Sequence, residues 1–307
     1  MVNRFQTFRT RLKNQLREAN RCDLIDEIWK WFSGVTGKER AYLLTHDHEI
    51  IFGEDHILSI MKRRLAGEPL AYIFGNAVFY GRDFNVGEGV LIPRPDSEIV
   101  IEVLLAFLGL ENDRHILTDQ KNPRRHIIPA DSLFFYDLCT GSGCLGITAF
   151  LELSIRGMKS KGRLIDISGK ALRYTSENIQ KWEAGNFLFP VQTDLTEGQD
   201  KKADFILSNP PYIPEAEIAG LMPEVSCFEP KIALDGGGDG LLFYRRVLKE
   251  SLGLLMPGGA LIMEHGYNQG ADVAKLFYEH GLCLVTTIQD YGGHERVTFG
   301  IKGIKTN

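Results

Sequence analysis

Apolar residues in the first quarter of the chain recur every three or four positions, which is the spacing of an amphipathic helix. In the first such segment these residues are Phe5, Phe8, Leu12 and Leu16. The same spacing recurs over 24–32 and 54–65, and Thr36 is placed to cap a helix over 38–44. We therefore expect residues 1–75 to form a small all-helical domain.

Glycines and short alternating apolar segments replace this pattern after residue 75. Gly81, Gly87 and Gly89 punctuate the alternation, which is typical of a β-hairpin. The apolar residues of the two segments are Phe84 and Val86, then Val90 and Ile92. We expect a hairpin linker over 76–95, a helix over 96–109, and then a mobile polar surface loop over 111–125.

From residue 133 onward, apolar runs that favour strands alternate with segments of helical spacing. The expected strands contain "LFFYDL", "RLIDI", "FLFPV", "DFILSN", "ALIMEHG", "CLVTTI" and "RVTFGI"; the expected helices cover 145–153, 170–182, 241–254 and 271–278. This alternation predicts an α/β domain over 96–307, with a mostly parallel sheet covered by helices on both faces. Only "QDYGGHE" separates the last two strands, so they should pair antiparallel.

Composition and charge narrow the possible function classes. The 307 residues carry a net charge of -5, which argues against a polyanion-binding protein with a basic surface. The five cysteines form no CxxC pair, which fits neither a zinc site nor a disulfide framework. No apolar run has the length of a membrane span. We expect a cytoplasmic monomer with no metal, no membrane partner and no direct nucleic-acid partner.

The extreme N-terminus permits two interpretations. Its basic residues, Arg4, Arg9, Arg11, Lys13 and Arg17, precede the first acid at Glu18. Such a composition is typical of an organellar transit peptide. The helical spacing of the apolar residues in the same segment favours the first helix of the folded protein instead.

A glycine-rich turn and an acid follow the first two strands of the α/β region. The segment "DLCTGSG", 137–143, ends the first strand, and Asp166 ends the second. In doubly wound sheets such a turn lies against a ligand, and such an acid accepts hydrogen bonds from ribose hydroxyls. Asp166 is also placed to cap the following helix. Because "GSGCLG" spells GxGxxG, this pattern leaves both a nicotinamide cofactor and S-adenosylmethionine open.

The segment "SNPPYIP", 208–214, follows a third apolar strand and favours the second of these cofactors. The two prolines stiffen the loop, and Asn209 supplies a carbonyl that accepts from an NH2 group. Loop carbonyls can accept a second hydrogen bond, and Tyr212 offers an aromatic face to a planar group. Two acceptors would orient a planar amide or amino nitrogen for methyl transfer without a dedicated general base. Hydride transfer has no comparable use for this loop.

The ordered set of motifs resembles the release factor glutamine methyltransferases, the HemK/PrmC family. The segments that carry the resemblance are "PLAYIFG", "FYGRDF", "VLIPRPDSE", "DLCTGSG", "DIS", "SNPPYI", "FEPKIALDGGGDGL" and "DYGGHERVTFG". The resemblance implies a seven-stranded methyltransferase fold preceded by a helical domain that helps to recognise the protein substrate. It also implies methyl transfer from S-adenosylmethionine to the glutamine side-chain nitrogen in the GGQ motif of peptide chain release factors.

Carried over to this sequence, the resemblance assigns roles residue by residue. It implies that the cofactor is bound by Cys139, Thr140, Gly141, Ser142, Gly143, Asp166, Asp194, Leu195 and Asn209. It implies that the substrate amide is held by Asn209, Pro210, Pro211 and Tyr212, with Asn209, Pro210 and Tyr212 as the catalytic group. The segment 92–98 would close over the cofactor. The sequence departs from the usual family pattern at Cys139, Asp96, Ser97 and Leu195, where glycine, glutamate, threonine and sometimes tryptophan are found.

Three alternatives to this function stay open at this stage. Methylation of a ribosomal protein glutamine would use the same chemistry and fold. Adenine methylation in nucleic acid would also use an NPPY loop, but the acidic composition and the lack of a target-recognition insertion count against it. A non-enzymatic binding module is disfavoured because Asn209 and Tyr212 are both present.

Overall fold

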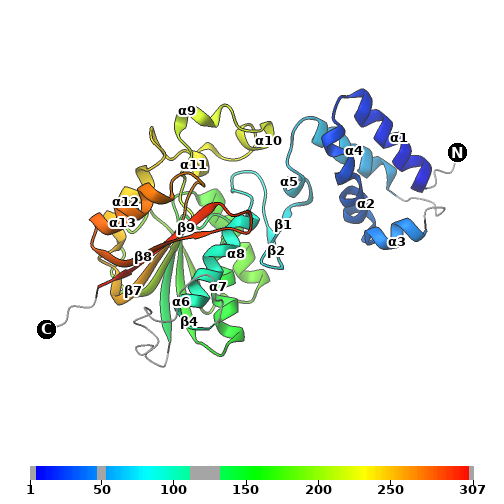
Figure 1. Ribbon diagram of the computed structural model, residues 1–307. Coiled ribbons are helices and arrows are strands. Elements are labelled where there is room, and N and C mark those ends of the chain that lie inside the picture. Colours follow the sequence, from blue (N-terminus) through cyan, green and yellow to red (C-terminus); the bar gives the residue numbers. More distant parts are fainter. Residues whose placement is uncertain (1–4, 47–52, 111–131, 304–307) are drawn as a thin grey trace. The chain divides into compact units, whose positions relative to one another are not determined.

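The computed structural model describes residues 5–46, 53–110 and 132–303 (Figure 1). The expected loop over 111–125 lies outside these residues. The chain divides into two compact units. One comprises Met1–Gly75 with Pro223–Phe228, and the other comprises Asn76–Met222 with Glu229–Asn307. No helix in the described ranges combines the length and the apolar character needed to cross a membrane.

The N-terminal part of the first unit is helical wherever it is described. Its elements are α1 (Phe5–Glu18), the 3-10 helix η1 (Cys22–Glu27), α2 (Ile28–Thr36), α3 (Arg40–Thr45), α4 (Glu54–Leu65) and α5 (Leu70–Phe74). The four apolar residues of α1 are all buried, as its spacing predicts. The expected cap at Thr36 is wrong: this residue ends α2, and its hydroxyl donates to the carbonyl of Phe32 at 2.7 Å.

A buried arginine joins three segments of this first unit. Arg64 in α4 is 1% exposed, and its guanidinium contacts Glu27 at 2.8 Å and Glu224 at 2.7 Å. Glu224 lies in the short helix α10 (Pro223–Ser226). Sequence analysis placed residues 223–228 with the α/β domain, whereas they belong to the compact unit that contains the N-terminal helices.

The β-hairpin expected over 76–95 exists, but its strands differ from the expectation. β1 (Asn76–Phe79) pairs antiparallel with β2 (Arg82–Asn85), and Tyr80 and Gly81 make the turn. Both turn residues have positive φ, 51° and 69°, as the tightest hairpin turns require. Val90 and Ile92 lie in no strand, because the hairpin closes before them.

The second unit contains a seven-stranded sheet in its described part (Figure 1). Its strands are β3 (Leu133–Leu138), β4 (Ser160–Asp166), β5 (Leu188–Gln192), β6 (Ala203–Ser208), β7 (Leu255–Glu264), β8 (Leu282–Gln289) and β9 (Glu295–Lys302). Their spatial order is β5-β4-β3-β6-β7-β9-β8. The pairings from β5 to β7 are parallel, and β9 is antiparallel to both neighbours. The mostly parallel sheet and the antiparallel end are thus confirmed.

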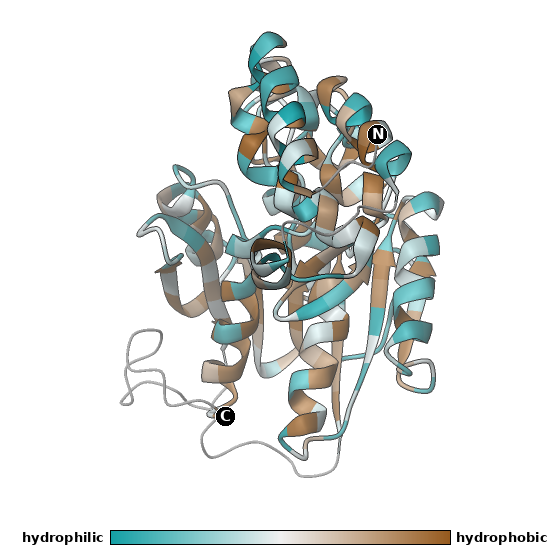
Figure 2. Ribbon diagram, turned by 90° about the vertical axis from the view of Figure 1, so that its right-hand side faces the viewer, coloured by the Kyte–Doolittle hydropathy of each residue, from teal (hydrophilic) through white to brown (hydrophobic). Residues whose placement is uncertain are grey.

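Helices cover both faces of this sheet, and each face has its own apolar core. On one face, α6 (Glu98–Phe107), α7 (Cys144–Ile155) and α8 (Gly169–Lys181) contribute to the first core. On the other face, α12 (Leu242–Ser251) and α13 (Gly270–Glu279) contribute to the second. α8, α12 and α13 bury residues three or four positions apart, as expected when one side packs on a sheet, whereas α6 and α7 are buried over most of their length. Figure 2 shows hydrophilic and hydrophobic positions along the helices of the molecule. This is the predicted α/β arrangement.

The strand order places two candidate motifs side by side. β3 and β6 are neighbours at the centre of the sheet, and Leu138 is in register with Ser208 at their carboxyl ends. The chain runs outward from β3 through β4 to β5, and outward from β6 through β7 in the opposite direction. The glycine turn after β3 and the NPPY loop after β6 therefore begin next to each other at the topological switch point, where α/β sheets bind ligands.

Candidate active site

The turn after β3 has a left-handed backbone at three residues. The φ angles are 58° at Cys139, 59° at Gly141 and 83° at Gly143. The N–H of Thr140 donates to the carbonyl of Ile165 at 2.9 Å, which ties the turn to the end of β4. A Cβ on Gly141 would meet only Val90 within 4 Å, at 3.7 Å. The turn therefore presents open backbone rather than side chains at this point.

Asp137 supports this turn from below. Its Oδ2 accepts from the Thr140 hydroxyl at 2.5 Å and from the Gly146 N–H at 2.9 Å. A Cβ on Gly146 would lie 2.9 Å from the same oxygen, so the last glycine of "GSGCLG" serves this close packing. Asp137 is fully buried, and this burial raises its pKa to about 7. The Asp137 carboxyl therefore stabilises the conformation of the turn through these two hydrogen bonds.

Asp166 ends β4 and is held by backbone donors on both oxygens. The N–H of Gly141 donates to Oδ2 and the N–H of Ser168 donates to Oδ1, each at 2.9 Å. Burial raises the pKa of Asp166, and these hydrogen bonds oppose that shift. The N-cap of α8 is Ser168, whose hydroxyl accepts from Ala171 N–H at 3.2 Å. Asp166 is therefore not the cap, and each carboxylate oxygen keeps acceptor capacity for a ligand.

The NPPY loop continues directly from the last residue of β6. Asn209 is half-buried, while Pro210 and Pro211 are buried. Tyr212 packs against the apolar core between the sheet and α12, and its burial raises the pKa of its hydroxyl. The stiff loop thus carries one polar side chain, Asn209, toward the space beside the glycine turn.

Two other segments brace the backbone of the NPPY loop, one after α11 (Lys231–Leu234) and one before α13. Gln269 Nε2 donates to the carbonyl of Tyr212 at 3.0 Å, and Gly236 N–H donates to the carbonyl of Ile213 at 2.8 Å. A Cβ on Gly236 would lie 2.7 Å from the Tyr212 Cα, so this contact requires glycine. Two glycines of "DGGGDG", Gly236 and Gly240, therefore support the NPPY loop through close backbone packing.

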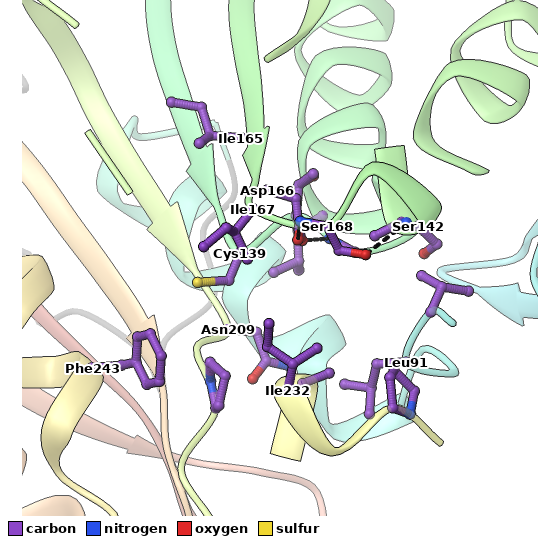
Figure 3. A pocket seen from close by; sticks show the side chains of 18 of the residues that line it. Leu91, Cys139, Ser142, Ile165, Asp166, Ile167, Ser168, Asn209, Ile232 and Phe243 are labelled. Carbon is purple, nitrogen blue, oxygen red and sulfur yellow. Dashed lines mark hydrogen bonds between the residues drawn. The ribbon is translucent and has the colours of Figure 1, made fainter. Parts of the chain in front are cut away.

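A pocket opens between these elements, and most of the predicted site residues line it. The predicted residues in its wall are Cys139, Thr140, Gly141, Ser142, Asp166, Asp194, Leu195, Asn209 and Pro211. Gly143, Pro210 and Tyr212 are absent from the wall as described. In Figure 3, Asp166 and Ser168 lie on one side of the open space, and Asn209, Ile232 and Leu91 lie across from them.

The side of the pocket opposite Asp166 is built from two segments far apart in sequence. The extended segment after the hairpin contributes Pro93 and Arg94, and the segment around α11 (Lys231–Leu234) contributes Pro230 and Ile232. The Arg94 guanidinium contacts both carboxylate oxygens of Glu229, at 2.7 and 2.8 Å. Because Glu229 is only 6% exposed, this ion pair fixes the two segments together inside the wall.

Sequence analysis missed two lining residues on α12, Phe243 and Arg246. Arg246 also forms an ion pair with Asp194 at 3.1 Å, which holds the loop after β5. Leu195 in that loop has a positive φ of 48°. The signal for Phe243 and Arg246 was present, because they lie three positions apart on one helical face, but no motif marks that face as part of a pocket.

Family models match both parts of the chain. Residues 8–75 match the PrmC N-terminal domain, and residues 129–251 match the methyltransferase small domain. The catalytic domain of hMettl16, solved in complex with MAT2A 3'UTR hairpin 6, has a TM-score of 0.55 and 14% identity. The similarity covers 89% of this chain and 95% of that one. This likeness supports the methyltransferase fold alone.

Curated relatives extend the match over nearly the whole chain. The release factor glutamine methyltransferase of Caulobacter vibrioides is 36% identical over 298 residues, which cover 95% of this chain and 94% of the relative. That of Fusobacterium nucleatum is 36% identical over 253 residues, which cover 81% of this chain and 63% of the relative. The chain spans 45% of the bifunctional methyltransferase of Rickettsia prowazekii. By its sequence and its methyltransferase fold, the chain belongs to the release factor glutamine methyltransferase family.

Proposed function

We propose that this protein transfers a methyl group from S-adenosylmethionine to the side-chain nitrogen of the glutamine in the GGQ motif of a peptide chain release factor. The observation that carries the proposal is the convergence of Asn209, the glycine turn and Asp166 on one pocket at the switch point of the sheet. Family membership supports the identity of the substrate.

The chemistry of the pocket fits S-adenosylmethionine. Asp166 offers two acceptor oxygens to ribose hydroxyls while its backbone hydrogen bonds hold it in place. The open backbone at Gly141 leaves room for the methionine portion of the cofactor. Phe243 and Leu195 supply apolar surface for a base, and Asp194 lies beside Leu195. When bound, the cofactor supplies a methyl group on a positively charged sulfur.

Asn209 would act on the substrate by positioning and by electrostatics. Its carbonyl oxygen would accept a hydrogen bond from the glutamine NH2 group, and the carbonyl of Pro210 would accept a second one. Two acceptors fix the plane of the amide and stabilise positive charge that develops on its nitrogen. The nitrogen would gain the methyl carbon as the bond from that carbon to sulfur breaks, and it would lose one proton to solvent, so the products would be a secondary amide and a neutral thioether. Tyr212 would stiffen this loop through its packing against the core.

The proposal is tested by methyl transfer from labelled S-adenosylmethionine to a purified release factor, with mass spectrometry to locate the label. We expect one methyl group on the GGQ glutamine. Asn209→Ala should abolish transfer and leave cofactor binding, measured by calorimetry, largely unchanged. A release factor in which the GGQ glutamine is replaced by alanine is the matched control and should accept no label. Transfer to a ribosomal protein or to DNA instead would overturn the substrate assignment but keep the cofactor.

A further inference from the structure

The NPPY loop contains a stiff segment, residues 209–211. Each proline fixes its own φ and confines the residue before it to extended conformations, so these three residues keep their shape as a unit. A stiff segment still turns as a whole about the free backbone angles at its two ends. The proposed function needs the Asn209 side chain and the Pro210 carbonyl to face the substrate amide together, so both ends must be held in place.

Backbone and side-chain hydrogen bonds hold both ends of this segment. At the first end, Ser208 is the last residue of β6, and its hydroxyl donates to the carbonyl of Leu138 in β3 at 2.9 Å. At the second end, the peptide group between Tyr212 and Ile213 donates its N–H to the carbonyl of Leu234 at 2.9 Å. The carbonyl of the same peptide group accepts a hydrogen bond from a side chain, so both of its polar atoms are held.

That side chain is Gln269, whose amide makes four hydrogen bonds. Its Nε2 donates to the carbonyl of Tyr212 at 3.0 Å and to the carbonyl of Gly240 at 3.3 Å. Its Oε1 accepts from the N–H of Gly266 at 2.9 Å and from the hydroxyl of Tyr244 at 3.2 Å. The residue is only 8% exposed, so these protein groups rather than solvent satisfy the amide.

The backbone partners of Gln269 allow one orientation of its amide. A backbone N–H only donates and a carbonyl only accepts, so the Gly266 N–H requires Oε1 and the two carbonyls require Nε2. Gln269 is also held by its own backbone, because its N–H donates to the Gly266 carbonyl and its carbonyl accepts from the Val273 N–H, each at 2.9 Å. The donor that holds the NPPY loop is therefore fixed by the protein itself.

Two glycines allow Gln269 to approach the backbone this closely. A Cβ on Gly240 would lie 2.6 Å from Gln269 Nε2, and a Cβ on Gly266 would lie 2.9 Å from Gln269 Oε1. Either contact would displace the amide, so both positions require glycine. The segments "DGGGDG" and "EHG" thus form a fitted site for the Gln269 side chain.

We propose that Gln269 is a positioning residue for the methyl transfer, which holds the second end of the NPPY loop so that Asn209 and the Pro210 carbonyl face the substrate amide together. This inference rests on the proposed function, because it explains how the two acceptors that this function requires are kept in place. Gln269 is absent from the pocket wall as described, so it acts through the loop and not by contact with a ligand.

A purely structural role for Gln269 makes a different prediction. Gln269 is the N-cap residue of α13, and it ties this helix to the carbonyl of Gly240. If that were its whole role, its loss would lower Tm and the folded fraction, but each folded molecule would turn over at the wild-type rate. The readouts are kcat per S-adenosylmethionine-binding molecule, KM for the release factor, Kd for S-adenosylmethionine and Tm.

Two variants remove the donors of Gln269 to different extents. Gln269→Met keeps the length of the side chain and removes all four hydrogen bonds. We expect it to lower kcat by about 10-fold, the size of one lost hydrogen bond, while KM and the Kd for the cofactor change less than about twofold. Gln269→Glu keeps an oxygen for Gly266 and Tyr244 but offers at most one O–H to the two carbonyls. Its kcat should lie between those of Gln269→Met and the wild type, and it keeps the test decisive where Gln269→Met does not fold.

Val273→Ala is the matched control on the same helix. Val273 is fully buried in the second core, one turn after Gln269, and its truncation removes apolar packing but no side-chain hydrogen bond. It should lower Tm about as much as Gln269→Met and keep kcat within about twofold.

The outcomes separate this inference from the proposed function. An active wild type and an inactive Asn209→Ala, together with wild-type kcat in both Gln269→Met and Gln269→Glu, would overturn this inference alone. An equal loss of kcat in Val273→Ala and Gln269→Met would also overturn it, because the loss would then follow stability. A wild type that labels no release factor would overturn the proposed function, and this inference with it.

Discussion

Two residues in the pocket wall adopt a backbone conformation that is uncommon without glycine. Cys139 and Leu195 have φ angles of 58° and 48°, and both follow the carboxyl ends of parallel strands. Cys139 occupies the first position of the glycine turn and lines the pocket. Cys139 is half-buried, and desolvation raises the pKa of its thiol, so the side chain is un-ionised at neutral pH. The backbone of Cys139 is thus the part of this residue that shapes the pocket.

Substitution of Cys139 tests this at the level of a single residue. Cys139→Gly should bind S-adenosylmethionine as the wild type does and unfold within about 1 kcal/mol of it, because relief of the left-handed strain offsets the lost burial. Cys139→Val should lose about 1–3 kcal/mol and bind the cofactor more weakly, because a β-branched residue tolerates positive φ poorly. Denaturant unfolding and calorimetry measure both effects. If Cys139→Gly failed to bind the cofactor, the Cys139 thiol rather than its backbone would be required for cofactor binding.

At the level of elements, the ion pair between Arg94 and Glu229 joins the segment before η2 to the segment before α11. Arg94→Ala would leave the buried Glu229 carboxylate without this partner and loosen one wall of the pocket. We expect Kd for S-adenosylmethionine to rise about 10-fold, with a loss of stability of a few kcal/mol. The double variant Arg94→Leu with Glu229→Leu removes both charges and should recover most of the stability but not the affinity. Equal cofactor binding by wild type and Arg94→Ala would contradict a role for this wall.

The same scale shows which features were predictable from sequence. The strand ends and their motifs were predictable, because an apolar run followed by glycine or by Asn-Pro marks where a strand must stop. The hairpin strands were displaced because Val90 and Ile92 continue the alternation after the turn at Tyr80 has already closed the pair. The Arg94 ion pair spans 135 positions and has no local signature. Tyr212, expected to offer an aromatic face to the substrate, packs against the core and is absent from the pocket wall as described.

At the level of the whole molecule, the chain passes between its two compact units three times, after residues 75, 222 and 228. The last two crossings lie between the NPPY loop and Glu229. The α/β unit also carries two buried acids in its central strands, Asp137 in β3 and Glu264 in β7, whose pKa values are each raised to about 7 by burial. These acids link the stability of this unit to pH.

The sign of that link follows from proton binding. Between about pH 4.5 and pH 7 the unfolded chain has released the protons of these acids while the folded protein still holds them, so stability falls as pH rises. His265 acts in the opposite direction, because burial lowers its pKa to about 4 and the unfolded chain binds its proton below about pH 6.5.

Comparison of the wild type with Glu264→Gln isolates the contribution of one of these acids to the pH dependence of stability. The free energy of unfolding of Glu264→Gln minus that of the wild type should rise by up to about 1.4 kcal/mol per pH unit between pH 5 and 7. This difference should level off above pH 7. Hydrogen exchange of amides in β3 and β7, resolved by mass spectrometry, measures this unit separately from the helical one. A difference that stays constant from pH 5 to 8 would mean that Glu264 ionises in the folded protein as it does in the unfolded chain.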